Sequence, residues 1–154
     1  MVKCYIGVGS NIGDRRKNIF SAIGLINLID DINIKQCSRI YETKPWGYKD
    51  QRDFFNAVLE IETRLSPEKL LSELKKIEKK MDRKKCVRWG PRAIDLDILF
   101  YGMRIISGKQ NLRIPHNELQ NREFVLRPLV EIAGGGFRHP VLKKSIRQLY
   151  RELK

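Results

Sequence analysis

The residues that could do chemistry begin with two aspartates inside an apolar segment. Asp95 and Asp97 stand one residue apart in "IDLDILFYG", which has the length and composition of a buried strand. Side chains two residues apart on a strand point to the same face, so the two carboxylates would lie side by side and repel each other unless a cation is near. Oxygen ligands of this kind suit Mg²⁺, and no His or Cys adjoins them in sequence to favour zinc. The alternative for so short a pattern is a salt-bridged strand at the surface.

Basic residues come just before the aspartates, at Arg83, Lys84, Lys85, Arg88 and Arg92. Guanidinium groups bind phosphate oxygens through paired hydrogen bonds, and two of these arginines flank a Trp-Gly-Pro turn. Carboxylates that bind a metal beside converging arginines form the arrangement that phosphoryl transfer requires. The alternative is a solvated basic loop, which fits the two lysines individually. The chain has no Walker-type or protein-kinase motif, so side chains and metal would have to hold the phosphates.

A third group of residues could bind a planar ring. Phe54 and Asn56 share one face of an expected strand, and an Asn amide both donates and accepts, as a heterocycle with amide edges requires. Trp46 and Phe124 could stack on such a ring, although any single Phe is by default a core residue. His116 lies in a polar loop, where it could contact a phosphate, but its surroundings in the sequence favour a structural role.

The elements that would position these residues follow from hydrophobic periodicity and turn signals. Strands are expected at 3–8, 32–42, 54–62 and 94–101, with a hairpin partner near 104–106. Helices are expected up to about residue 28, from residue 67, near residue 124 and at 142–152. This β-α-β, β-α-β order predicts an α+β, ferredoxin-like fold, in which an antiparallel-containing sheet is flanked by helices in a three-layer α-β-α arrangement. We expect one domain over residues 1–154.

The composition limits the class of protein and its partners. The 154 residues include 31 Lys and Arg against 18 Asp and Glu, a net charge of +13. Such an excess predicts an anionic partner (nucleic acid, a membrane surface or a phosphorylated small molecule) or simply a Lys-rich surface. Cys4, Cys37 and Cys86 form no Cys-x-x-Cys pair, which is typical of a reducing cytoplasm. The N-terminal apolar run is too short for a signal peptide, and no stretch is long enough to span a bilayer, so we expect a cytoplasmic protein.

Four segments together resemble the hydroxymethyl-dihydropterin pyrophosphokinase family of folate biosynthesis. They are "GSNIGD", "ETKPWGYKDQRDFFNAV", "RWGPRAIDLDILFYG" and "IPHNELQNREFVLRPL", in the same order over nearly the whole chain. The resemblance implies the ferredoxin-like fold and transfer of a pyrophosphoryl group from ATP to the hydroxymethyl group of 6-hydroxymethyl-7,8-dihydropterin, with release of AMP. It implies small-molecule substrates, no nucleic acid or membrane partner, and a monomer.

The resemblance also implies roles for individual residues. Two Mg²⁺ ions would be bound by Asp95 and Asp97. The residues implied in catalysis are Arg83, Arg88, Arg92, Asp95 and Asp97. Those implied in binding ATP are Glu78, Arg83, Arg88, Trp89, Arg92, Ile98, His116 and Arg122. Those implied in binding the pterin are Thr43, Trp46, Phe54, Asn56, Asp95 and Phe124. The loops at 43–53 and 82–92 are expected to close over bound nucleotide.

The chain departs from the family pattern in places, and rival readings exist. Asp82 replaces a loop glycine, Lys85 stands where a second arginine is frequent, and Asn117 stands where an aromatic residue is common. The main rival is a basic ferredoxin-like RNA-binding module without catalysis, but the chain has no Lys/Arg-Gly-Phe/Tyr strand of the RRM type. An inactive scaffold is the other alternative, and the intact Asp and Arg set speaks against it.

Overall fold

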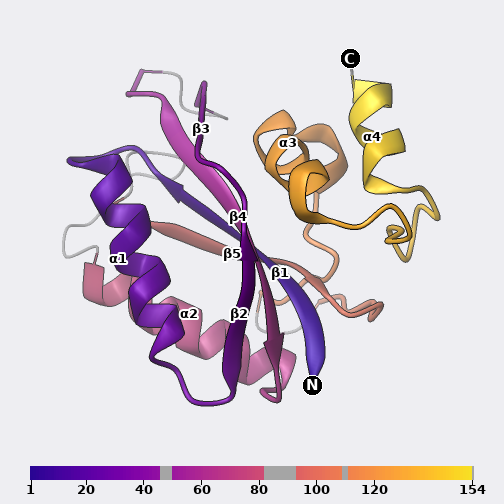
Figure 1. Cartoon of the computed structure of the whole chain (residues 1–154), viewed down its shortest axis with the longest axis horizontal. Helices are drawn as coiled ribbons and strands as arrows, with labels where there is room; N and C mark the ends of the chain where they lie inside the picture. Colours follow the sequence, from indigo (N-terminus) through magenta and orange to yellow (C-terminus); the bar gives the residue numbers. More distant parts are fainter. Residues whose placement is uncertain (46–49, 82–92, 109–110, 154) are drawn as a thin grey trace.

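The fold is one sheet with helices on both of its faces, as Figure 1 shows. The structure is a computed structural model and describes residues 1–45, 50–81, 93–108 and 111–153. The strands are β1 (Val2–Ser10), β2 (Ile32–Cys37), β3 (Tyr41–Thr43), β4 (Phe54–Thr63) and β5 (Asp95–Tyr101). All of the strand pairs are antiparallel, and the order across the sheet is β2, β4, β1, β5, with β3 also paired to β4.

The helices form the two outer layers. They are α1 (Arg15–Asn27) and α2 (Pro67–Met81) on one face, and α3 (Glu123–Ile132) and α4 (Ile146–Leu153) on the other. A short 3₁₀ turn, Leu119–Asn121, precedes α3. Because α1 connects β1 to β2 and α2 connects β4 to β5, with β4 placed between β1 and β2, the chain has the interleaved topology of a ferredoxin-like fold. The predicted fold class and its three layers are confirmed.

Local signals explain where the first two helices begin. Asp14 caps α1, since its carboxylate accepts a hydrogen bond from the Lys17 backbone N–H at 3.0 Å. Ser66 caps α2 in the same way through Lys69 N–H at 3.1 Å, and Pro67 follows at the first helical position, as expected. The buried positions of α2 recur at helical spacing and face the sheet, so this helix seals the core on its side.

The prediction of one continuous strand at 32–42 is wrong, because the strand is interrupted between the end of β2 and the start of β3. Ser38 takes over the hydrogen bonding to β4 at the break. Its backbone N–H donates to the Val58 carbonyl, and its Oγ accepts from Val58 N–H, both at 2.9 Å. β3 then resumes the pairing with β4 opposite residues 54–56.

Two other predicted elements differ from the structure. Near 104–106 there is an isolated bridge between Ile106 and Ile114 instead of a hairpin strand. The last helix begins at Ile146 and not at 142, because residues 139–144 form a turn. In this turn, Nδ1 of His139 accepts hydrogen bonds from the backbone N–H groups of Val141 and Leu142.

β5 contains one extra residue, and this residue changes which face the strand's later side chains occupy. Asp97 pairs with Gly7 and Ile98 with Ile6, but Phe100 pairs with Tyr5, so Leu99 is bulged. Leu99 and Phe100 therefore both lie on the α3 face. The Leu99 carbonyl accepts a hydrogen bond from His116 N–H at 3.0 Å, so the bulge also fixes the start of the loop that leads to α3.

Candidate active site

A cavity of about 450 Å³ lies on the α3 face, within the usual size range of small-molecule sites. Its walls come from β1, β3, β4, β5, the loop before α3 and the start of α3. The lining residues include Gly7, Gly9, Thr43, Lys44, Phe54, Asn56, Asp95, Asp97, His116, Asn117, Arg122 and Phe124. Residues from five separate parts of the sequence thus meet here, among them eight that the sequence analysis had singled out for the site.

The cavity exists because two positions of β1 have no side chain. Gly7 lies directly opposite Asp97 and Gly9 directly opposite Asp95, so these four residues share one face of the sheet. Sequence reasoning missed both glycines as site residues. The available signal was their spacing, since glycines within a strand often mark a close approach of a ligand.

An ordered amide closes one end of the cavity. Asn56 lies opposite Gly9 in the sheet, and its Nδ2 donates a hydrogen bond to Thr43 Oγ1 at 2.6 Å. The amide oxygen is then directed toward Gly9, where a Cβ would lie only 2.7 Å from it. Phe54, on the same face of β4, also lines the cavity, as the strand alternation predicted. This end therefore offers a fixed polar edge beside an aromatic wall.

The other end carries the two carboxylates and two basic side chains. His116 Nε2 lies 3.9 Å from Asp97 Oδ2, although the sequence favoured a structural role for this histidine. His116 Nδ1 lies 2.7 Å from the Asn117 carbonyl oxygen, which can only accept, so Nδ1 carries a hydrogen. Nε2 consequently faces the cavity and attracts Asp97 strongly only when it too is protonated.

Arg122 supplies a cation from the start of α3. Burial lowers the pKa of its guanidinium group, and the nearby carboxylates of Asp97 and Glu118 oppose that shift. Its guanidinium carbon lies 5.7 Å from the centroid of the Phe124 ring, within the range of a cation–π interaction. Arg122 thus places positive charge between the carboxylate end of the cavity and Phe124 at its amide end.

Two residues implied in ATP binding do not line this cavity. Glu78 lies at the outer edge of β5, where its Oε2 accepts from Leu96 N–H at 2.7 Å and its Oε1 from Lys75 Nζ at 3.0 Å. Burial raises the pKa of Glu78, while these two hydrogen bonds oppose the rise. Ile98 is buried in the core under α1 and α2. The ATP roles of Glu78 and Ile98 stay predictions.

Five predicted site residues lie outside the described residues, together with most of the loops expected to close. They are Trp46, Arg83, Arg88, Trp89 and Arg92. The expected loop closure is therefore also untested.

The "GSNIGD" motif, expected to form a turn and a helix N-cap, also holds the segment that enters β4. Asn11 Nδ2 donates to Gln51 Oε1 at 2.6 Å and to the Arg52 carbonyl at 3.1 Å. Arg15, one residue past the motif, donates to the Asp53 carbonyl at 2.8 Å. The β1–α1 turn thereby fixes the approach to Phe54 and Asn56.

The donor set at the carboxylate end fits a magnesium ion. Asp95 and Asp97 offer hard oxygen ligands from adjacent positions on one strand face, and Mg²⁺ in proteins is commonly bound by one or two carboxylates together with water and substrate oxygens. The chemistry of the residues present therefore agrees with the metal that the sequence predicted.

A family model described as 7,8-dihydro-6-hydroxymethylpterin-pyrophosphokinase matches residues 5–134. The chain belongs to this family. A relative from Aquifex aeolicus, named 2-amino-4-hydroxy-6-hydroxymethyldihydropteridine pyrophosphokinase, is 41% identical over 96% of this chain and 90% of its own length. A relative of the same name from Haemophilus influenzae is 45% identical over 86% of this chain and 82% of its own length. The predicted family is confirmed, and the RNA-binding alternative has no support.

Some relatives are longer proteins of which this chain spans only a part. The "Folic acid synthesis protein fol1" of Pneumocystis carinii is 46% identical over 97% of this chain but only 20% of its own length. A Plasmodium falciparum HPPK-DHPS structure with pteroate matches 98% of this chain and 42% of its own, with a TM-score of 0.76 and 18% identity. At that identity the structural match supports the fold alone. Within the described part of the chain, no helix is long and apolar enough to cross a membrane.

Proposed function

We propose that the cavity on the α3 face is the place where ATP and 6-hydroxymethyl-7,8-dihydropterin react, with transfer of a pyrophosphoryl group to the pterin hydroxymethyl group and release of AMP. The chain is a pyrophosphokinase of folate biosynthesis by family, a transferase that uses ATP as co-substrate. The observation that carries the residue assignment is one cavity with an ordered amide at one end and a carboxylate pair at the other.

The pterin is assigned to the amide end. Asn56, held by Thr43, can donate to and accept from the amide edge of the pterin ring, while Phe54 and Phe124 offer apolar ring surfaces on either side. Trp46, which lies outside the described residues, is proposed for the same pocket. Gly7 and Gly9 leave the sheet surface flat below the ring.

The phosphates of ATP are assigned to the carboxylate end. Asp95 and Asp97 would bind Mg²⁺, which when bound neutralises charge on the phosphate oxygens, and we propose two ions. Arg122 would donate to phosphate oxygens in the same space, and His116 Nε2 would do so when the imidazole is protonated. The remaining ATP-binding residues in this proposal are Glu78, Arg83, Arg88, Trp89, Arg92 and Ile98.

The transfer itself depends on alignment and charge. The pterin hydroxyl oxygen forms a bond to the β-phosphorus, and the bond from that phosphorus to the oxygen of the leaving AMP breaks. The fixed amide orients the pterin, and the basic side chains stabilise negative charge that moves toward AMP. Arg83, Arg88 and Arg92 are proposed to add positive charge during the step. The hydroxyl proton is transferred to Asp97 or to solvent.

The deciding experiment is AMP release from Mg-ATP with and without the hydroxymethyl-dihydropterin, for the wild-type chain and for Asp97→Ala. Pterin-dependent AMP that disappears in the variant supports the proposal. Release of ADP in place of AMP would mean ordinary kinase chemistry, and no turnover by a folded chain would mean an inactive scaffold.

The proposal also covers the domain organisation, the oligomeric state and the location of the protein. We propose that residues 1–154 act as one domain, that the chain is a monomer and that it works in the cytoplasm. Size-exclusion chromatography with light scattering would test the monomer directly.

A further inference from the structure

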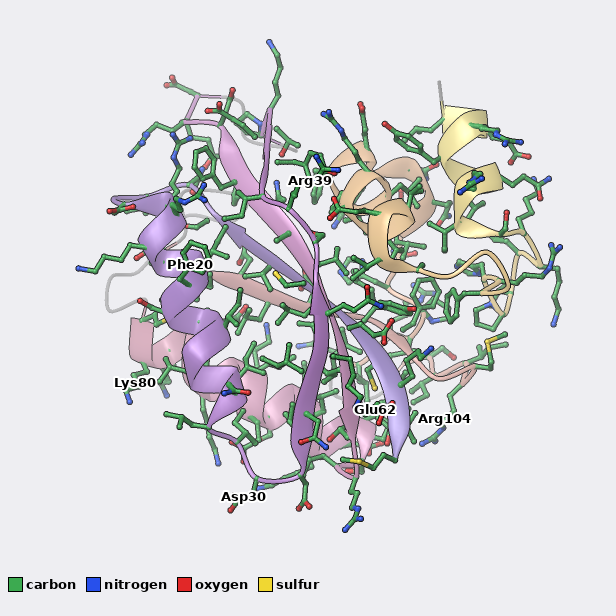
Figure 2. All side chains as sticks on the ribbon, in the orientation of Figure 1. Phe20, Asp30, Arg39, Glu62, Lys80 and Arg104 are labelled. Atoms are coloured by element: carbon green, nitrogen blue, oxygen red, sulfur yellow. The ribbon has the colours of Figure 1, made fainter. Side chains whose placement is uncertain are left out.

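The Glu131 carboxylate of α3 binds the segment at residues 39–41, which leads from β2 into β3, where the strand pairing with β4 is interrupted. Glu131 Oε1 accepts a hydrogen bond from the Tyr41 hydroxyl at 2.5 Å, and its Oε2 accepts from Arg39 N–H at 2.9 Å. The Arg39 Nε also lies 3.6 Å from Oε1. Figure 2 shows Arg39 on the side of the strands that faces α3. One side chain thus receives both backbone and side-chain donors from the segment that leads into β3.

The break between β2 and β3 leaves the Arg39 N–H outside the strand pairing, where it is bound by Glu131. Ser38 satisfies β4 on one side of the break, whereas the Arg39 N–H, at the surface, donates to Glu131 of α3. Tyr41 is held a second time by the same helix, since the Arg127 guanidinium carbon lies 4.6 Å from its ring centroid. The hydrogen bond to Glu131 raises the pKa of Tyr41, so its hydroxyl keeps the proton that it donates.

The segment fixed in this way is one wall of the cavity. Tyr41 lies directly opposite Asn56 in the sheet, and Thr43 lies opposite Phe54. Thr43 in turn accepts the hydrogen bond that orients the Asn56 amide. A second wall includes Phe124, at the first turn of the helix that carries Glu131. Glu131 therefore ties the two walls together, although it does not itself line the cavity.

We propose that Glu131 is a positioning residue for ring recognition: through Tyr41 and β3 it sets the separation between the Thr43–Asn56 pair and Phe124. The inference rests on the proposed function, because it assumes that the pterin ring binds between these walls. It predicts that loss of Glu131 weakens pterin binding selectively and leaves the binding of ATP at the carboxylate end largely unchanged.

The test measures both ligands separately on Glu131→Ala, Tyr41→Phe and the double variant. Dissociation constants for 6-hydroxymethylpterin, from its own fluorescence, and for a non-hydrolysable ATP analogue are measured without turnover. We expect Glu131→Ala to weaken pterin binding about tenfold, or ~1.4 kcal/mol, with ATP-analogue binding within twofold of wild type. Tyr41→Phe should lose less pterin affinity, because the hydrogen bond between the Arg39 N–H and Glu131 remains. The pterin affinity of the double variant should match that of Glu131→Ala.

Two comparisons separate positioning from general destabilisation. Glu152→Ala removes another surface carboxylate, which lies on α4 and pairs with Lys144 in the turn before that helix. It should leave both affinities unchanged. Glu131→Gln keeps one acceptor and should recover part of the pterin affinity. Steady-state kinetics should show a raised KM for pterin with a much smaller change in KM for ATP.

Unchanged pterin affinity in folded Glu131→Ala would overturn the inference, as would an equal loss for the ATP analogue or an additive double variant. If Glu131→Ala does not fold, Tyr41→Phe, which loses one hydroxyl, decides by the same criteria. A wild-type chain that binds pterin but releases no AMP would refute the proposed activity while leaving the inference about Glu131 supported or refuted by the binding data alone.

Discussion

The two faces of the sheet use the same strands for different purposes. On the α1/α2 face, Ile6 and Val8 of β1 and Leu96 and Ile98 of β5 are buried in a continuous aliphatic core. On the α3 face, the positions between them on β1 are Gly7 and Gly9, and those on β5 are Asp95 and Asp97, which line the cavity. Because neighbouring residues of a strand point to opposite faces, one lies in the core and the next lines the cavity. Substitutions at neighbouring positions should therefore affect stability in one case and activity in the other.

The α3 face is itself divided. Away from the cavity it has an aromatic core, in which the Tyr5, Phe100 and Phe137 rings meet edge to face at centroid distances of 4.8 to 6.3 Å. The bulge at Leu99 brings Phe100 to this side. One half of the face is thus closed by rings while the other half is left open by glycines.

The largest effect is expected on the cavity face, from Asp97→Ala. Loss of a carboxylate that we propose to bind Mg²⁺ should lower kcat/KM about 10³-fold or more, since metal-ion catalysis is worth several kcal/mol. The melting temperature should stay near the wild-type value, because the variant also removes one of two adjacent like charges. Coupled AMP assays and thermal melts measure the two effects.

A matched control is Asp30→Ala, which removes an exposed carboxylate between α1 and β2 (labelled in Figure 2) that does not line the cavity. It should leave kcat/KM unchanged. If the kcat/KM of Asp97→Ala were within tenfold of wild type, the conclusion that the cavity face carries the chemistry would be wrong.

The opposite face should respond in stability alone. Leu74→Ala, on the buried side of α2, should lower the free energy of unfolding by about 2–5 kcal/mol, because it leaves a cavity in a closed core. Urea denaturation measures this loss, and the KM values of the remaining folded enzyme should stay near wild type. Leu28→Ala, at a position 78% exposed, should change stability by less than ~0.5 kcal/mol. A raised pterin KM in Leu74→Ala would show that the faces are coupled.

A smaller and sharper test compares the two glycines of β1. A Cβ at Gly9 would lie 2.7 Å from the Asn56 amide oxygen, and that amide is held in place by Thr43. Gly9→Ala should therefore displace the amide and raise the KM for pterin about tenfold, the equivalent of one lost hydrogen bond. At Gly7 the nearest atom, on Leu99, is 3.5 Å away, which is ordinary contact, so Gly7→Ala should have a weaker effect. Equal effects would mean that cavity volume, and not the amide, determines pterin affinity.

The smallest effect is expected in the turn before α4, from the pH dependence of folding. Burial lowers the pKa of His139 in the folded chain, and its Nδ1 accepts two backbone hydrogen bonds. On acidification the unfolded chain takes up this proton first, near its ordinary pKa of 6.5. Stability should therefore fall as the pH drops below about 6.5, by at most ~1.4 kcal/mol per pH unit, and stay level at higher pH.

The check is the urea midpoint at pH 7.5 and 5.5 for wild type and His139→Asn. The variant should lose less stability on acidification, since an amide oxygen can accept hydrogen bonds without titrating. An identical pH dependence in both proteins would assign the acid sensitivity to other groups.

Features that depend on local sequence could be predicted, and those that depend on distant contacts could not. The start of α2 at Ser66 and Pro67, the shared face of Phe54 and Asn56, and the paired carboxylates all follow from spacing within a few residues. The break after β2 does not, because Glu131, which accepts the Arg39 N–H, is 92 residues away. Residues 32–42 look like one continuous strand until that partner is known.

The same distinction applies within the site. The sequence identified His116 only through the family resemblance, because its neighbour Asp97 is brought near by the β5 bulge and the hydrogen bond to Leu99. The alternation of side chains along a strand does not predict the bulge, since "DLDILFY" has the sequence pattern of an uninterrupted strand. The roles of Gly7 and Gly9 became evident only from the register, which places them opposite the carboxylates and Asn56.

The position of Glu78 has a consequence for association between chains. β5 lies at one edge of the sheet, and an edge strand with free N–H groups can template the addition of a strand from another molecule. The Glu78 carboxylate occupies the Leu96 N–H on this edge, and Lys75 places a charged ammonium group beside it. A foreign strand would have to displace a charged pair to gain that hydrogen bond, so the edge next to the aspartates is protected against aggregation by the helix that packs beneath it.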